Sequence, residues 1–185
     1  MGKFFYAAIF AALLLSACSQ PADTKSANEN LSATAPVVVE AKKKEIATPD
    51  LDMSLALYTR RLNRSFEENE LPWYVNDAKF FEGEVNDSYT APIGKYAVLS
   101  VSVTKKKQLV SVTVMTSGDG TKSSGYEVLM AASAALSAAA PRTELKDVLN
   151  VMPQLVSGQS IDAGGVVFRA KNMDSLGLWF FAEPK

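Results

Sequence analysis

Apolar residues recur every three or four positions between residues 51 and 66, the spacing of one face of an α-helix. The pattern predicts a first helix over about residues 52–69, which begins after Pro49-Asp50 and ends before Pro72. Its apolar face carries Leu51, Leu55, Tyr58, Leu62 and Phe66. Its opposite side carries Arg60, Arg61 and Arg64, which are expected either to be solvated or to form a patch for an anion or a partner.

Three segments rich in β-forming residues follow this helix and predict strands over residues 79–85, 96–104 and 109–115. The last two are joined by a hairpin loop at residues 105–108. Leucine and valine alternate there with serine and threonine, so one sheet face is expected to be buried and the other to meet water. The serine- and threonine-rich face is also a candidate binding face.

The second half of the chain begins with a predicted mobile loop over residues 116–125. An alanine- and serine-rich helix over residues 126–140 follows. It is apolar nearly all round, so we expect it to be largely buried, with small side chains that allow close packing on the sheet. A third helix, capped by Thr143, is expected to extend to about Val156.

Pro153 is expected to kink or shorten this third helix, and Gly158 to end it. A final hairpin is predicted from residues 165–171 and 178–183. The inward residues of the third helix are expected to be Leu145, Leu149 and Met152, and those of the hairpin Phe168, Trp179 and Phe181.

The predicted element order is α-β-β-β-α-α-β-β. It indicates one α+β domain over residues 50–185, with a five-stranded antiparallel sheet packed by helices. This order is similar to that of the type III secretion chaperones, and the resemblance implies a binding module without catalysis.

Composition excludes several kinds of chemistry. The chain has 185 residues, a formal net charge of −1 and a pI near 5.6, so it lacks the basic footprint of a nucleic-acid-binding protein. It has no histidine, which excludes Ser-His or Cys-His catalysis and imidazole metal sites. Its single cysteine excludes an internal disulfide and a thiolate zinc cluster. We therefore expect no metal and no cofactor.

The first residues have the order of a secretion signal. Lys3 precedes an apolar run over residues 4–15, which as a helix would be about 18 Å long, too short for the ~30 Å hydrocarbon core of a bilayer. The run ends in Leu15-Ser16-Ala17-Cys18. This motif resembles the lipobox of bacterial lipoproteins. The alternative is an ordinary secretory signal with an unrelated cysteine.

The resemblance implies that residues 1–17 are a removed signal peptide and that Cys18 is acylated, which holds the protein at a lipid bilayer. Two or more acyl chains anchor stably, whereas one anchors only marginally. Ser19 follows the cysteine, and in this family serine at that position favours the outer over the inner membrane. Residues 18–49 are predicted to be the lipidated cysteine and a flexible linker, because residues 19–49 lack aromatic side chains.

Candidate chemistry in the domain is sparse. The glycine-containing segment 118–125 lacks the Lys-Ser/Thr pair that a phosphate-binding loop needs after its second glycine. Glu82 and Glu84 are expected to share one face of a strand, with Asp87 following. Paired carboxylates can hydrolyse glycans when their separation and pKa values suit the reaction. The simpler interpretation is a pair of exposed strand acids.

Two large aromatic residues, Trp73 and Tyr74, lie in a polar connector after the first helix. Such residues either stack on glycans and anchor partner interfaces, or fill the gap between helix and sheet. With the three arginines they are the candidate partner-binding residues of the chain.

The sequence thus favours a lipid-anchored cell-envelope protein that binds another envelope component, most simply a protein, without catalysis. One alternative is a cell-wall glycan hydrolase or lyase that uses carboxylates such as Glu82 or Glu84. Another is a small-ligand carrier, if the sheet and the buried helix enclose a cavity.

Overall fold

The computed structural model describes residues 48–185. The predicted signal peptide, the lipobox with Cys18 and nearly all of the predicted linker lie outside the described residues. Within residues 48–185, no helix combines the length and the apolar character needed to cross a membrane.

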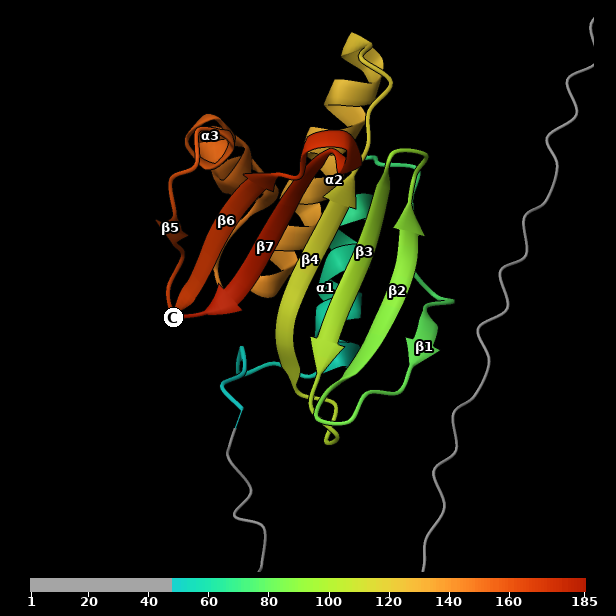
Figure 1. The fold of residues 1–185 in the computed structure, drawn as a ribbon, viewed down its shortest axis with the longest axis vertical. Coiled ribbons are helices and arrows are strands. Elements are labelled where there is room, and N and C mark those ends of the chain that lie inside the picture. The colour runs from blue at the N-terminus through green and yellow to red at the C-terminus, as the bar shows by residue number, and fades with distance from the viewer. Residues whose placement is uncertain (1–47) are drawn as a thin grey trace, which may run out of the picture. The chain divides into compact units, whose positions relative to one another are not determined.

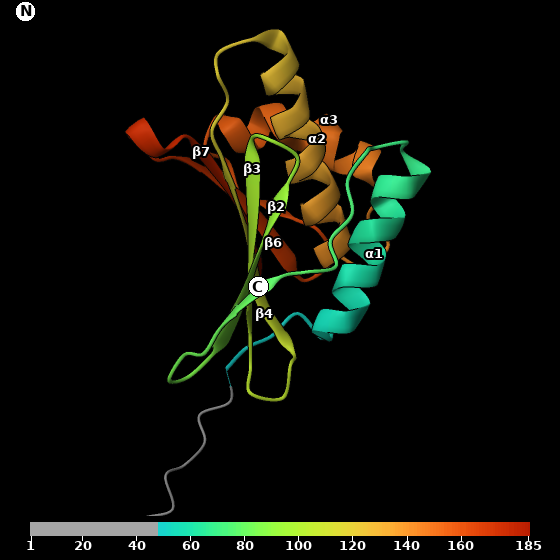
Figure 2. The same ribbon diagram turned by 90° about the vertical axis from the view of Figure 1, so that its right-hand side faces the viewer.

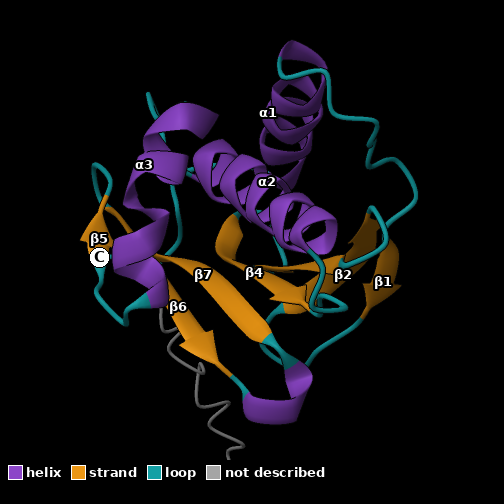
Figure 3. Ribbon diagram, turned by 90° about the horizontal axis from the view of Figure 1, so that it is seen from above, coloured by secondary structure: helices purple, strands orange, loops and turns teal. Residues whose placement is uncertain are grey.

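The domain has two layers, an antiparallel sheet and three helices that all lie on one face of it (Figures 1 and 2). The view from above shows the helices over the strands and leaves the other sheet face uncovered (Figure 3). The helices are α1 (Leu55–Glu68), α2 (Lys122–Ala139) and α3 (Leu145–Val156), with a short 3-10 helix η1 (Asp174–Leu176). The strands are β1 (Lys79–Phe81), β2 (Asp87–Ile93), β3 (Ala97–Val103), β4 (Leu109–Thr116), β5 (Ile161–Asp162), β6 (Val166–Asn172) and β7 (Leu178–Pro184).

The strands lie in the order β1-β2-β3-β4-β7-β6-β5, and every neighbouring pair is antiparallel. The α+β class is confirmed, but the expected five strands are seven. The predicted strand over residues 79–85 ends at Phe81, and β2 and β5 were missed. Asp87, Ser88 and Pro92 gave β2 the composition of a turn. Thr90 is the last residue of β2 that pairs with β1, so β2 is an open edge at Pro92. A proline is tolerated there because no neighbouring strand needs the N–H that it lacks.

The apolar stripe of α1 packs against α2 and the sheet. Tyr58, Leu62 and Phe66 are buried as expected, while Leu55 is only half-buried. The helix begins at Leu55 because the Ser54 hydroxyl caps it by accepting a hydrogen bond from the backbone N–H of Leu57. Leu51 is buried as well, in an extended segment whose backbone N–H donates to the carbonyl oxygen of Leu109.

The central helix α2 is buried on nearly every side, as its composition predicted. Its small residues let it pack closely on the sheet and on α1 and α3, and the buried ones are Ser124, Ala131, Ala132, Ser133, Ala134, Ala135, Ser137, Ala138 and Ala139. The predicted mobile loop 116–125 is wrong in its second half. The helix already begins at Lys122, because the Thr121 side chain accepts a hydrogen bond from the backbone N–H of Ser124.

The third helix differs from the prediction at its start. Its N-cap is Glu144 and not Thr143, and Glu144 forms a reciprocal capping box with Asp147. Pro153 does not shorten the helix, which continues to Val156 before Gly158 ends it at φ +91°.

The expected core role of Trp179 and Phe181 is wrong. Residues alternate along β7, and the helix-facing positions are Phe180 and Ala182, both fully buried. Phe181 pairs with Thr113 on the uncovered face, so it and Trp179 are half-buried there. Phe168 is buried as expected.

Candidate functional site

The outward side of α1 carries two unpaired positive charges. Arg60 and Arg64 are both exposed and stand one helical turn apart. No arginine of α1 takes part in any ion pair formed by residues 48–185. Arg64 and Glu68 are four residues apart on the helix, a spacing that permits an exposed ion pair, but no such pair forms. These two guanidinium groups remain open to an anionic partner.

Arg61 has a different role, because it turns inward and caps α2. Its guanidinium donates hydrogen bonds to the backbone carbonyl oxygens of Ser137, at 3.1 Å, and Ala140. Both carbonyls lie at the C-terminal end of α2, where the helix has no further turn to satisfy them, although the Ser137 oxygen also accepts the backbone N–H of Ala140 at 3.3 Å. A cation beside them also suits the helix dipole. Burial and, to a smaller extent, the charge of Arg64 lower the pKa of Arg61.

A first hollow, the Arg61 groove, separates α1 from the junction of α2 and α3. Its volume is about 650 Å³. Arg60, Arg61 and Arg64 line one wall, and the start of α3 lines the other. Lys146 and Glu144 pair there at 2.7 Å, with both side chains exposed.

A second hollow, the Trp73 groove, runs along the other flank of α1 and has a volume of about 1010 Å³. Its far wall is the segment Leu71–Asn76. The indole of Trp73 is half-buried and meets the ring of Phe66 edge to face, with centroids 5.6 Å apart. Tyr74 is 71% exposed. Trp73 therefore both fills the gap beside α1 and lines the groove, whereas Tyr74 is free for a partner.

Arg60 and Arg64 line both grooves, so the fold gathers all five candidate partner-binding residues around α1. We call this region the α1 surface. It comprises the two grooves and the residues Arg60, Arg61, Arg64, Trp73 and Tyr74. Sequence reasoning missed Asn63, whose side-chain amide bonds to the backbone of Val75 and so fixes the far wall of the Trp73 groove. Nothing in the local sequence distinguishes Asn63 from any other solvated asparagine on a helix.

A third hollow, the Tyr89 cavity, lies between α1 and the sheet and measures about 190 Å³. Four of its lining residues also line the Trp73 groove: Leu55, Thr59, Val75 and Asn76. The others are mostly apolar and come from the core side: Tyr58, Ala78, Tyr89, Ala91, Leu99 and Val101. The sequence suggested a cavity only in the small-ligand-carrier alternative, and it placed that cavity between the sheet and the buried helix α2. The observed cavity lies beneath α1 instead.

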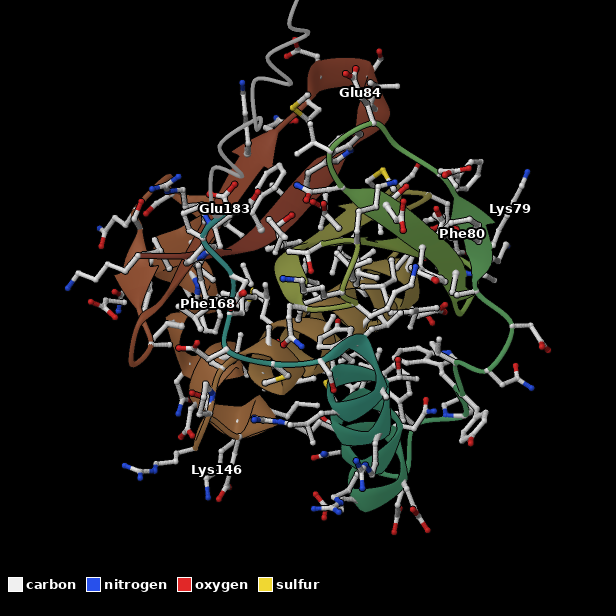
Figure 4. All side chains as sticks on the ribbon, turned by 90° about the horizontal axis from the view of Figure 1, so that it is seen from below. Lys79, Phe80, Glu84, Lys146, Phe168 and Glu183 are labelled. Atoms are coloured by element: carbon white, nitrogen blue, oxygen red, sulfur yellow. The ribbon has the colours of Figure 1, made fainter. Side chains whose placement is uncertain are left out.

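The acidic residues that follow β1 are not part of the α1 surface. β1 ends at Phe81, so Glu82 and Glu84 lie in the following loop and the expected shared strand face is wrong. Both are exposed, and neither lines any of the three hollows. Figure 4 shows Glu84 beyond the sheet and Lys146 at the opposite, helical side.

Asp87 is the one buried acid of this region, at 4% exposure. The ammonium groups of Lys105 and Lys107 donate to its two carboxylate oxygens at 2.7 Å and 2.9 Å. These hydrogen bonds, first from Lys105 and then from Lys107, lower the pKa of Asp87 to about 2. Both lysines come from the predicted hairpin loop, so this cluster ties the end of the β3–β4 hairpin to the start of β2.

The glycine-containing segment 118–125 also holds neighbouring parts of the fold together. The Asp119 carboxylate accepts hydrogen bonds from the Tyr96 hydroxyl, at 2.6 Å, and from the Thr121 hydroxyl, at 2.7 Å. Hydrogen bonding to the side chains of Ser124, Tyr96 and Thr121 lowers the pKa of Asp119. These bonds join the start of α2 to the turn between β2 and β3.

Across residues 48–185, no group of three or more cysteine and acidic side chains is placed to hold a metal ion. No protein-family model, no curated protein and no solved structure matches the chain. The geometry of the α1 surface is therefore the basis for a functional argument.

Proposed function

We propose that the chain is a lipid-anchored cell-envelope protein whose domain binds another envelope component, without catalysis, through the α1 surface. The lipobox ending in Cys18 supports the anchor. Ser19 favours the outer membrane, on the sorting pattern of the lipoproteins that the signal resembles. Neither residue lies in the described part of the chain.

One observation carries the binding function: two exposed arginines without acidic partners stand between two grooves, beside an exposed tyrosine. Arginine and tyrosine are enriched among the residues that dominate partner binding. An arginine in water gains little from a solvated anion, but it gains more when a partner excludes water around the pair. The partner that fits is an acidic protein surface of the envelope.

The glycan-hydrolase alternative needs two carboxylates that face each other across a cleft. Glu82 and Glu84 lie on an exposed loop outside the three hollows, and the side chain of Glu82 is 81% exposed. No feature of residues 48–185 favours that alternative over binding.

Photo-crosslinking in native cells tests the proposal. A photoreactive amino acid replaces Tyr74 in one strain and Lys171, exposed on β6, in a control strain. We expect one defined crosslinked partner from position 74, loss of that partner in the double variant R60Q/R64Q, and no such product from position 171. Equal products from both positions would contradict binding at the α1 surface.

The anchor is tested separately by membrane fractionation and mass spectrometry. The variant C18S is expected to leave the membrane fraction, and the native protein is expected to carry acyl chains at its amino-terminal cysteine. An unacylated chain that begins at Met1 would remove the anchor from the proposal.

A further inference from the structure

We infer that the Trp73 groove and the Tyr89 cavity together bind an acidic, extended peptide segment of the partner, which inserts one Phe- or Leu-sized side chain into the cavity. This inference rests on the proposed function and names the chemistry of the partner. It rests on two observations. The two hollows share four lining residues, and the unpaired charges of Arg60 and Arg64 line the groove.

The size of the cavity selects a single side chain. An engineered protein cavity of about 150 Å³ lined by apolar side chains accepts benzene. The Tyr89 cavity measures about 190 Å³, so it matches one ring or one branched aliphatic side chain. Pockets for whole small-molecule ligands measure roughly 300–1,000 Å³, more than this cavity offers.

The lining of the cavity selects an apolar group. Ala91, Leu99 and Val101 line its sheet side, and these positions are almost fully buried. The mouth carries the polar side chains of Thr59 and Asn76, which also line the groove. An inserted apolar side chain would thus meet apolar contacts inside, while the peptide backbone beside it stays next to hydrogen-bonding groups.

The shape of the groove selects an extended segment. Its α1 wall runs from Leu55 to Glu67, a rise of about 18 Å at 1.5 Å per residue. About five or six residues of extended chain cover that length. The opposite wall, Leu71–Asn76, is itself held in place by α1, so the groove exists before a ligand enters.

The charge of the groove selects acidic neighbours for the anchor. Arg60 and Arg64 stand on its rim without ion-pair partners, against the single acid Glu67. A carboxylate on each side of the anchor residue would reach these two guanidinium groups, which bind carboxylates in planar, two-point geometry.

The test uses the full-length chain as its host produces it, kept in a mild detergent, and a displayed library of random dodecapeptides as the probe. We expect selected peptides to share one bulky apolar residue flanked by aspartate or glutamate. Replacing that apolar residue with alanine should weaken binding about 30-fold, the effect of a typical interface hot spot. Affinities are measured by fluorescence anisotropy of the resynthesised peptides.

Two kinds of variant locate the site. R60Q/R64Q should weaken binding of a selected peptide about 2- to 30-fold, the combined effect of two exposed charge pairs. The control R142Q/K171Q removes the same number of charges elsewhere and should leave the affinity unchanged. A91L and A78L each place a larger side chain in the cavity lining. Each should abolish the contribution of the bulky residue, and A78L serves if A91L unfolds the protein.

Three results would overturn the inference: no selected peptide, selected peptides without an acidic and apolar pattern, or binding that all α1 and cavity variants retain. Binding to phosphatidylglycerol vesicles that depends on Arg60 and Arg64, with no peptide selected, would assign the surface to lipid instead. A defined partner crosslinked to position 74 together with any of these results would leave the proposed function standing and reject only the peptide mode.

Discussion

The side-chain amide of Asn63 is bonded on both of its polar atoms to the backbone of Val75. Its nitrogen donates to the Val75 carbonyl oxygen, and its oxygen accepts from the Val75 N–H, each at 2.8 Å. The two residues belong to opposite walls of the Trp73 groove. This pair therefore holds the segment Leu71–Asn76 at a fixed distance from α1 and keeps the groove open.

Replacing Asn63 with alanine is expected to release that segment. The loss of two hydrogen bonds to a buried residue should lower the free energy of unfolding by about 1–2 kcal/mol. The freed segment should also expose Trp73, so its fluorescence should become easier to quench with iodide. The control N150A changes an exposed asparagine on α3 and should do neither. Unchanged quenching in N63A would show that the segment is held by other contacts.

Arg61 is expected to contribute to stability, unlike its neighbours. R61M keeps the apolar stem but leaves the terminal carbonyl oxygens of Ser137 and Ala140 without their charged donor. Urea denaturation should show a loss of about 1–2 kcal/mol. R64M, on the solvated side of the same helix, should change the free energy of unfolding by less than about 0.5 kcal/mol. Equal losses in the two variants would remove the capping role of Arg61.

Gly177 is expected to be irreplaceable at the turn into β7. Its φ of 89° and ψ of −163° lie in a region that is open essentially to glycine alone, and an added Cβ would overlap the carbonyl oxygen of Thr116. G177A should therefore cost about 3 kcal/mol or more in thermal or urea unfolding. G158A is the matched control, because Gly158 also has a positive φ of 91° but has no atom within 4 Å of an added Cβ. Its cost should stay near 1–2 kcal/mol, the backbone strain alone.

Asp87 is expected to make stability depend on acid pH. Its pKa is lowered from the ordinary 3.8 to about 2 in the folded protein by Lys105 and Lys107. The folded state thus favours the ionised carboxylate, and the contribution is complete above about pH 4 and lost as the pH falls toward 2. Unfolding free energies measured from pH 6 to pH 2 should show this loss.

The variant D87N should be less stable at neutral pH and should lack this part of the pH dependence. E82Q changes an acid that is 81% exposed, 4.0 Å from the Lys105 ammonium, and should keep the wild-type profile. Superimposable profiles for D87N and the wild type between pH 4 and pH 2 would assign the acid sensitivity to other groups.

Several elements follow from the sequence because their signals are local. The three- and four-residue spacing of Tyr58, Leu62 and Phe66 is enough to define α1, since a helix brings those positions to one face whatever it packs against. The alternation in β3 and β4 likewise defines the hairpin, and its buried positions face the helices as expected. The alanine-rich α2 is buried because it has no polar face to offer to water.

Features that depend on pairing between distant segments could not be predicted from the sequence. β2 carries turn-forming residues and becomes a strand because β3 pairs with its whole length and β1 with part of it. Trp179 and Phe181 alternate with Phe180 as any strand does, and only the pairing of β7 with β4 decides which set faces the helices.

The candidate site divides in the same way. The sequence by itself determined which residues bear charge and aromatic surface, and it placed Arg60, Arg61 and Arg64 on one helix with Trp73 and Tyr74 nearby. Tertiary structure alone decided that Arg61 is committed to α2 while Arg60 and Arg64 are free, and that a cavity lies beneath α1. The physical reason is that periodicity is fixed by the local backbone, whereas hydrogen-bond partners and unfilled space depend on how separate elements meet.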